Sequence, residues 1–136
     1  MHATATDGNG PRRIFHVSSR QNIMELRDEI LRMHGFFVQS TIYYAQVIDE
    51  IVRVSYDLVL IDVESDVRVK SAQDLCDKIK KAAPGQHVAF VCNYRVGIES
   101  DCPDEIIRTE FNPRVLVSGI QETLEKIEDK DRALRR

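Results

Sequence analysis

The sequence contains no apolar run long enough to cross a bilayer, and its first ten residues include no hydrophobic core of a signal peptide. It also has no basic stripe, because 19 lysines and arginines are mixed with 22 acidic residues, giving a net charge of -3. Proteins that bind nucleic acid normally concentrate positive charge on one face. We therefore expect neither a membrane nor a nucleic acid as a partner.

Cysteine is also scarce. The three cysteines, Cys76, Cys92 and Cys102, lack the spacing of a metal site, and their odd number leaves at least one thiol unpaired. A reducing cytoplasm is the simplest setting for such a chain. We expect no disulfide between Cys92 and Cys102.

The composition suits one domain, because 136 residues with 43% hydrophobic content can bury one proper core but not two. Residues 1–11 are small, polar and rich in turn formers, so we expect a disordered tail there. Residues 12–128 form the predicted domain. Residues 129–136 are mostly charged, and we expect them to fray into solvent.

From residue 12 onward, short apolar runs alternate with segments of helical spacing. The pattern predicts five strands: one at 13–17, one that begins at 36, one that ends at 62, one at 87–92 and one at 105–111. It also predicts four helices: one that ends at about 34, one over about 45–54, one at 71–83 and one that begins at 113. The expected inner face of the first helix is Ile23, Leu26, Ile30 and Met33. This alternation indicates an α/β fold, a doubly wound parallel sheet with helices on both faces.

The most informative stretch is the block from Tyr56 to Val63. Its residues 58–61 are consecutively apolar, which predicts a strand buried on both faces in the middle of a parallel sheet. Asp62 follows this run directly. Parallel sheets place their chemistry just beyond the carboxyl ends of the strands, so Asp62 is the leading candidate for a functional residue.

This block and the helical pattern before it resemble the receiver domains of bacterial two-component response regulators, over about residues 12–127. The resemblance implies a five-stranded flavodoxin-like sheet in the order 2-1-3-4-5. It also implies a non-enzymatic role in phosphorelay signal transduction. In that family, the position of Asp62 holds the aspartate that accepts a phosphoryl group.

The other functional positions of the family are changed in this sequence. Ser18 and Ser19 stand where the family has an acidic pair that holds a divalent metal. Cys92 replaces the hydroxyl residue that ends the fourth strand, and Thr109 or Glu110 replaces the lysine that ends the fifth. Hydroxyls bring no charge to a hard cation such as Mg²⁺. The chain therefore resembles a degenerate receiver, or pseudo-receiver.

These positions also have simpler structural interpretations. Ser18 and Ser19 would cap the first helix, and Cys92 would be a small buried apolar residue. Glu64, two residues beyond Asp62, is either a substitute carboxylate or a solvated loop acid. We expect no cofactor and no metal site, and the candidate ligands for Mg²⁺ are Asp62 and Glu64.

The stretch between the fourth and fifth predicted strands is short. Residues 94–104 include Gly97 and Pro103 and leave room for about one turn of helix. The family has several more residues here. We expect the fourth helix to be shortened or missing.

These features favour a stand-alone receiver-like module that acts by protein–protein interaction, with its phosphoacceptor chemistry lost or vestigial. The expected partner is a histidine kinase, a phosphotransfer protein, another regulator or a second copy of the chain. The alternative is a working receiver that a histidine kinase or phosphotransfer protein phosphorylates on Asp62. An enzyme or flavin carrier is disfavoured, because no Gly-rich phosphate loop follows the first strand.

Overall fold

The computed structural model describes residues 6–7, 10–110 and 112–134 of the chain. Its main feature is a five-stranded parallel sheet in the spatial order β4-β3-β5-β6-β7. The strands are β3 (Arg13–Val17), β4 (Phe37–Thr41), β5 (Leu58–Val63), β6 (Val88–Cys92) and β7 (Glu105–Arg108). Numbered from the first strand of this sheet, the order is the predicted 2-1-3-4-5, so the predicted fold is confirmed.

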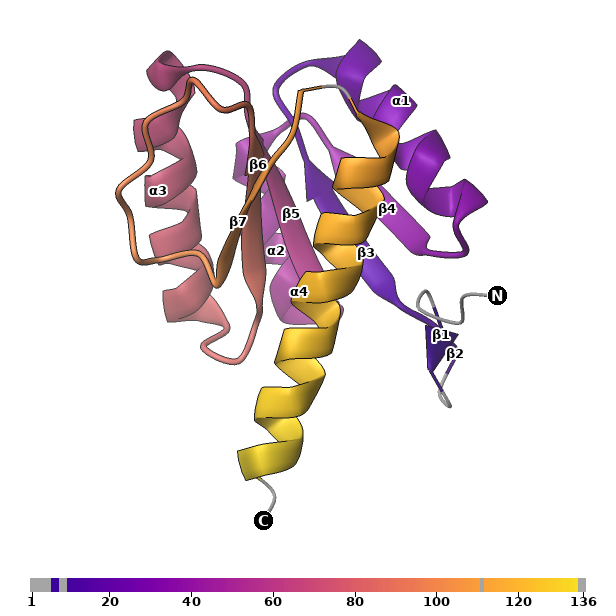
Figure 1. Cartoon of the computed structure of the whole chain (residues 1–136). Coiled ribbons are helices and arrows are strands. Elements are labelled where there is room, and N and C mark those ends of the chain that lie inside the picture. The colour runs from indigo at the N-terminus through magenta and orange to yellow at the C-terminus, as the bar shows by residue number, and fades with distance from the viewer. Residues whose placement is uncertain (1–5, 8–9, 111, 135–136) are drawn as a thin grey trace.

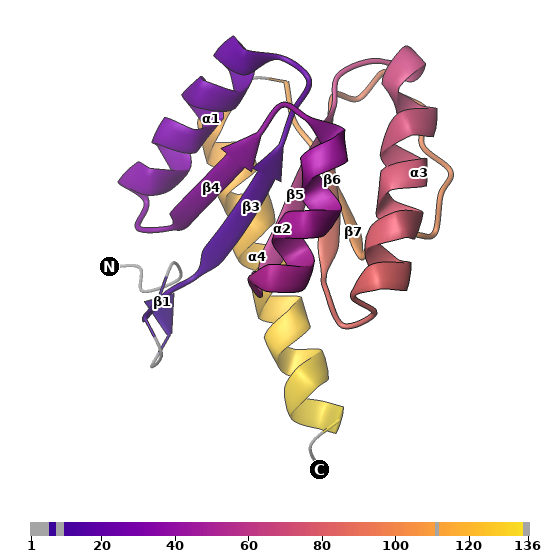
Figure 2. The same ribbon diagram turned by 180° about the vertical axis from the view of Figure 1, so that it is seen from behind.

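The described residues form four α-helices, α1 (Gln21–Met33), α2 (Val47–Arg53), α3 (Asp66–Ala82) and α4 (Pro113–Leu134), with a 3₁₀ turn, η1 (Tyr44–Gln46), before α2. Helices α1 and α4 cover one face of the sheet, and α2 and α3 cover the other (Figures 1 and 2). Residues 93–104, between β6 and β7, form neither helix nor strand. The fourth helix of the receiver fold, which we expected to be shortened or missing, is therefore missing. No helix in the described ranges has the length and apolar character needed to span a membrane.

Strand β5 lies at the centre of the core, and all six of its residues are buried. Val59, Ile61 and Val63 face α2 and α3, whereas Leu58 and Leu60 face α1 and α4. Side chains alternate between the two faces of a strand, so a continuous apolar run fills both layers. The burial pattern predicted for this run is confirmed.

The start of α4 also follows the sequence. The Asn112 Oδ1 accepts a hydrogen bond from the Arg114 N–H at 3.0 Å, so this side chain caps the helix. The apolar residues that recur at helical spacing along α4 are buried, namely Leu116, Ile120, Leu124 and Ile127.

The far end of α4 differs from the prediction, because the helix continues to Leu134 instead of fraying from 129. Oppositely charged side chains three and four residues apart form ion pairs in this last part of the helix. Arg132 pairs with Glu128 at 3.8 Å and with Asp129 at 3.2 Å. Such pairs stabilise an exposed helix by a few tenths of a kcal/mol each.

The N-terminal prediction is also partly wrong. Strand β1 (Thr6–Asp7) pairs antiparallel with β2 (Gly10–Pro11). Gly10 takes a φ of +103°, a conformation that glycine adopts at little cost, so residues 6–7 and 10–11 form an antiparallel pair. Residues 1–5 and 8–9 of the predicted tail lie outside the described residues.

Helix α3 begins earlier than expected. Its first residue is Asp66, so residue 71, where the sequence pattern placed the start, lies inside the helix. An acidic residue in the first turn suits the positive end of the helix dipole. The Asp66 Oδ1 also accepts the Gly97 N–H at 3.0 Å, which ties the start of α3 to the β6–β7 connection.

A disulfide joins Cys76 of α3 to Cys102 of the 93–104 connection, and this pair was not foreseen. The expectation that Cys92 and Cys102 stay unlinked is confirmed, because Cys92 keeps a buried free thiol. Cys76 and Cys102 are 26 residues apart in sequence but have Cα atoms only 6.3 Å apart. Their proximity depends on the path of the connection along α3.

The closest approach of α4 to the sheet gives a first prediction. A Cβ added at Gly119 would lie 2.6 Å from Cγ2 of Ile107. We expect Gly119→Ala to lower the free energy of unfolding by about 1–3 kcal/mol in urea, because overpacking outweighs the gain in helix propensity. The exposed neighbour Ser118 supplies the control, since Ser118→Ala should change stability by less than about 0.5 kcal/mol. Equal effects of both changes would contradict the close contact.

Candidate functional site

The candidate site lies where β3 and β5 end beneath helix α1. The two strands are neighbours, with His16 paired to Leu60 and Val17 to Ile61. Their alternation turns His16 and Asp62 toward the face that α1 covers. Asp62 is only 1% exposed and His16 is fully buried, so neither side chain reaches bulk water.

Two cations hold the carboxylate of Asp62. His16 Nε2 lies 2.9 Å from Oδ2, and Arg27 Nη1 lies 2.8 Å from Oδ1. Both contacts are ion pairs without the directed geometry of regular hydrogen bonds. Each oxygen of Asp62 therefore already has a positive neighbour within the domain.

The other side of the imidazole meets a second buried carboxylate. His16 Nδ1 donates to Asp28 Oδ1 at 2.7 Å, and the Ser40 hydroxyl donates to Asp28 Oδ2 at 2.6 Å. His16 thus bridges Asp28 and Asp62. We call His16, Arg27, Asp28 and Asp62 the buried charge network; two positive and two negative side chains balance its charge.

The network keeps His16 protonated at neutral pH. Burial by itself lowers the pKa of His16, but the two carboxylates outweigh it and raise this pKa from 6.5 to about 9. For Asp62, burial acts to raise the pKa, and His16 and Arg27 reverse this effect and hold the pKa below its usual value. Asp62 is therefore an ionised carboxylate whose charge is neutralised internally.

The two serines do not cap α1 as expected. The residue before the helix is Arg20, and it makes no side-chain cap. The Ser18 hydroxyl lies 3.1 Å from Glu64 Oε1, and the Ser19 hydroxyl lies 3.2 Å from Glu64 Oε2. Glu64, a partly exposed loop residue, is thus held against both serines.

The buried face of α1 differs from the prediction. Its fully buried residues are Asp28 and Leu31, whereas Leu26 is 56% and Met33 is 76% exposed. Hydrophobic spacing alone favours the opposite choice. The helix is turned so that Arg27 and Asp28 meet His16 and Asp62, because these buried charges require partners.

Sequence reasoning therefore missed Arg27, Asp28 and Ser40. One signal was present, since His16 interrupts an otherwise apolar strand. A buried histidine needs polar partners for its two ring nitrogens, but the sequence did not show which residues would supply them. The structure shows His16 as a fully buried imidazole whose two ring nitrogens face Asp28 and Asp62.

The remaining predicted positions meet at a small cavity of about 70 Å³, lined in part by Arg27, Glu64, Cys92 and Thr109. The thiol of Cys92 and the side chain of Thr109 are buried, and burial raises the pKa of the Cys92 thiol. The Thr109 hydroxyl donates to the Asn112 carbonyl at 3.3 Å, and Glu110 is exposed. Strand β7 ends at Arg108, so the buried Thr109 directly follows it, whereas Glu110 lies one residue further on.

The residues present do not fit a Mg²⁺ ion. Magnesium needs accessible anionic oxygens, and those of Asp62 are buried and already paired with His16 and Arg27. The serines are neutral and their hydroxyls face Glu64. Among the residues that the structure describes, no three His, Cys, Asp or Glu side chains are grouped as metal ligands.

No protein-family model matches the chain, and no curated protein is similar to it in sequence. Solved structures do match. A CheY-like response regulator receiver domain protein from Methanospirillum hungatei gives a TM-score of 0.71 at 23% identity, over 88% of this chain and 98% of that one. The fold is that of a response-regulator receiver domain.

A second receiver fold of the same kind is the response regulator TrrA from Thermotoga maritima. Its complex with Mg(2+)-BeF matches with a TM-score of 0.68 at 23% identity, over 82% of this chain and 98% of that one. In complex with the histidine kinase ThkA, TrrA matches with a TM-score of 0.69 at 22% identity, over 83% and 98% of the two chains. At these identities the similarity establishes the receiver fold and not an activity.

The pKa of His16 predicts how stability depends on pH. Because this pKa is 6.5 in the unfolded chain and about 9 in the folded one, the folded state binds the proton more tightly. The resulting stabilisation is complete below pH 6.5 and is lost as pH rises to about 9, by about 3 kcal/mol in total. Urea unfolding across this range should show the loss in the wild type but not in His16→Gln. An imidazole that titrates near 6.5 by NMR would contradict the network.

Removing the carboxylate should also be costly. Asp62→Asn removes the carboxylate that pairs with Arg27 and leaves His16 with Asp28 alone, so we expect the free energy of unfolding to fall by about 3 kcal/mol. The pKa of His16 should fall as well. Glu64→Gln serves as the control at the partly exposed acid and should cost about 1 kcal/mol or less. A neutral or stabilising Asp62→Asn would show that the network does not support the fold.

Proposed function

We propose that this chain is a pseudo-receiver, a signalling module that acts by protein–protein interaction and has lost phosphoacceptor chemistry. The observation that carries the proposal is the state of Asp62. Its side chain has 0% exposure, and both oxygens are paired with cations inside the domain. The carboxylate thus serves the fold instead of standing ready for reaction.

The physical argument concerns access and charge. Phosphoryl transfer needs a carboxylate that a donor can approach in line and cations that neutralise the phosphoryl oxygens. His16 and Arg27 are already balanced by Asp28 and Asp62. A phosphoryl group on Asp62 would replace the single negative charge of the carboxylate by a charge of about -1.5 to -2, in a closed site without a spare cation in the network.

The surface near the site supports a protein as the partner. Helix α1 and the start of α4 form an apolar pocket of about 110 Å³, lined in part by Ile23, Leu26, Ile30 and Leu116. Leu26, at 56% exposure, gives this pocket an apolar rim that a partner side chain can cover. Arg27 of the buried charge network also lines this pocket, so a partner bound there would lie next to the network.

The partner classes that we propose are a histidine kinase, a phosphotransfer protein, another regulator or a second copy. TrrA, which shares the fold, forms a complex with the histidine kinase ThkA. We also propose a cytoplasmic location, which such partners share.

Treatment with a small phosphodonor tests the loss of chemistry. We expect phosphoramidate with Mg²⁺ to leave the intact mass of the protein unchanged, because no donor reaches Asp62. In NMR, Mg²⁺ with beryllofluoride should leave the amide signals of Asp62 and its neighbours in place. TrrA, whose Mg(2+)-BeF complex is known, is the positive control.

Asp62→Asn distinguishes the alternative function. Stoichiometric phosphorylation of the wild type that disappears in Asp62→Asn would establish a working phosphoacceptor and overturn the proposal. Labelling that persists in Asp62→Asn would lie elsewhere and would leave the proposal standing.

A further inference from the structure

The connection from β6 to β7 takes the place of a crossover helix. Residues 93–104 run beside α3 on the same side of the sheet (Figure 1). Within this stretch, Val96 is 4% exposed, and Ile98 and Cys102 pack against the core layer beneath α2 and α3. An irregular connection of this length is uncommon in a compact domain and is often functional.

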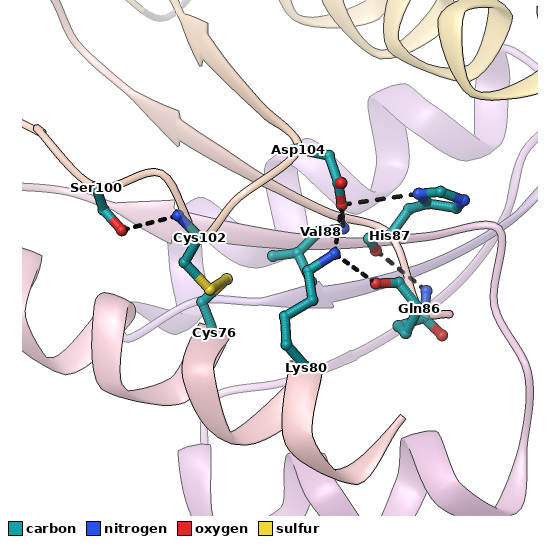
Figure 3. Close-up of a disulfide and its surroundings, with 8 residues drawn as sticks. All are labelled: Cys76, Lys80, Gln86, His87, Val88, Ser100, Cys102 and Asp104. Atoms are coloured by element: carbon teal, nitrogen blue, oxygen red, sulfur yellow. Dashed lines mark hydrogen bonds and ion pairs between the residues drawn. A yellow bond between two sulfur atoms is a disulfide. The ribbon is translucent and has the colours of Figure 1, made fainter. Parts of the chain in front are cut away.

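Three attachments hold the connection to α3. The Gly97 N–H donates to Asp66 Oδ1 at 3.0 Å, and Lys80 Nζ donates to Asp104 Oδ2 at 2.7 Å. Between these ends, the disulfide of Cys76 and Cys102 makes the link. Figure 3 shows the disulfide and the Lys80–Asp104 pair one helical turn apart on the same side of α3.

The attachments differ in kind. The Asp66 and Lys80 contacts are polar and lie near the surface, where single hydrogen bonds and ion pairs contribute little. The Cys102 N–H donates to Ser100 Oγ at 3.1 Å, which is a contact inside the connection itself. The disulfide is therefore the strongest constraint on the central residues 98–103.

We propose that the Cys76–Cys102 disulfide is a redox-controlled latch, whose reduction releases residues 98–103 from α3. The proposal is independent of the state of Asp62, because the latch lies on the other face of the sheet. This proposal rests on the cytoplasmic location proposed above, because a disulfide in a reducing compartment is usually a transient or redox-sensing bond and not a permanent one. Opening would uncover the apolar contact of Ile98 with the core layer.

The reduction requires a dithiol as the reductant. One of its thiolates attacks the sulfur of Cys102, the partly exposed half, because Cys76 is 0% exposed. The S–S bond breaks, a mixed disulfide forms, and the Cys76 thiolate leaves and takes up a proton. The second thiol of the reductant then displaces Cys102 as a thiol. The protein gains two electrons and two protons, and the dithiol becomes a disulfide.

The third cysteine stays outside this exchange. Cys92 is 2% exposed, and burial raises the pKa of its thiol although Arg108 acts in the opposite direction. The thiolate is the reactive form, so Cys92 is a poor nucleophile toward the latch. Thiol counting should therefore report the Cys76–Cys102 pair, because Cys92 is shielded in the folded protein.

Limited proteolysis of the full chain tests the latch. Glu99 is exposed between the disulfide and the Gly97 contact, and a glutamyl endopeptidase cuts after it only when the backbone is released. We expect cleavage after Glu99 to be about tenfold faster, or more, after treatment with dithiothreitol. Amide exchange of residues 98–103 should accelerate likewise, while β5 stays protected.

Cys102→Ser should be cleaved rapidly under both conditions, and Cys92→Ala should behave like the wild type. Equal cleavage of oxidised and reduced wild type would overturn the proposal, because the connection would be held without the disulfide. Loss of protection across β5 on reduction would also overturn it, because the bond would then hold the whole domain together. Persistence of the disulfide in millimolar reduced glutathione would also overturn the proposal, because the bond would not respond to the thiol–disulfide balance of a cell.

Discussion

A buried imidazolium between two carboxylates is the interaction on which the candidate site and the packing of α1 depend. His16 joins Asp28 to Asp62, and Arg27 completes the balance of charge. Four charged side chains in a protein interior are tolerated only as a complete set, because removing one leaves another charge without compensation. The network fixes which side of α1 faces the sheet, and it closes the carboxyl end of β5 to solvent. The buried charge network therefore determines both how α1 packs on the sheet and how accessible Asp62 is.

The same network explains why the changed residues around it form a coherent set. A receiver-type site that binds a metal needs several carboxylates around an accessible cation. Here Ser18 and Ser19 are neutral, Glu64 accepts their hydroxyls, and the cations come from His16 and Arg27. The side chains of His16 and Arg27 thus supply the positive charge that a bound metal ion would supply in a metal-binding receiver site. Such a site has one stable charge state near neutral pH, which suits a module that is recognised by its shape.

The connection between β6 and β7 shows a second way of replacing a lost element. A helix would satisfy its own backbone and pack as a unit, whereas residues 93–104 depend on attachments to α3 and on Arg108, which donates to the carbonyls of Asn93 and Val96. The covalent link supplies order that short-range hydrogen bonding does not provide there. Order of this kind depends on the redox state, since the constraint is a bond that thiols exchange.

Local patterns in the chain were enough to predict the five strands of the main sheet, the class of fold and the start of α4. The apolar run of β5 and the Asn112 cap are examples, and the family resemblance led to the correct strand order. Only the tertiary structure decided that Asp28 is buried while Leu26 is exposed, and that Cys76 meets Cys102. Hydrophobic periodicity assigns every charge to the surface. It contains no information about a charged partner on another strand. The long-range contacts that bury a charge or pair two thiols are formed only when the chain folds.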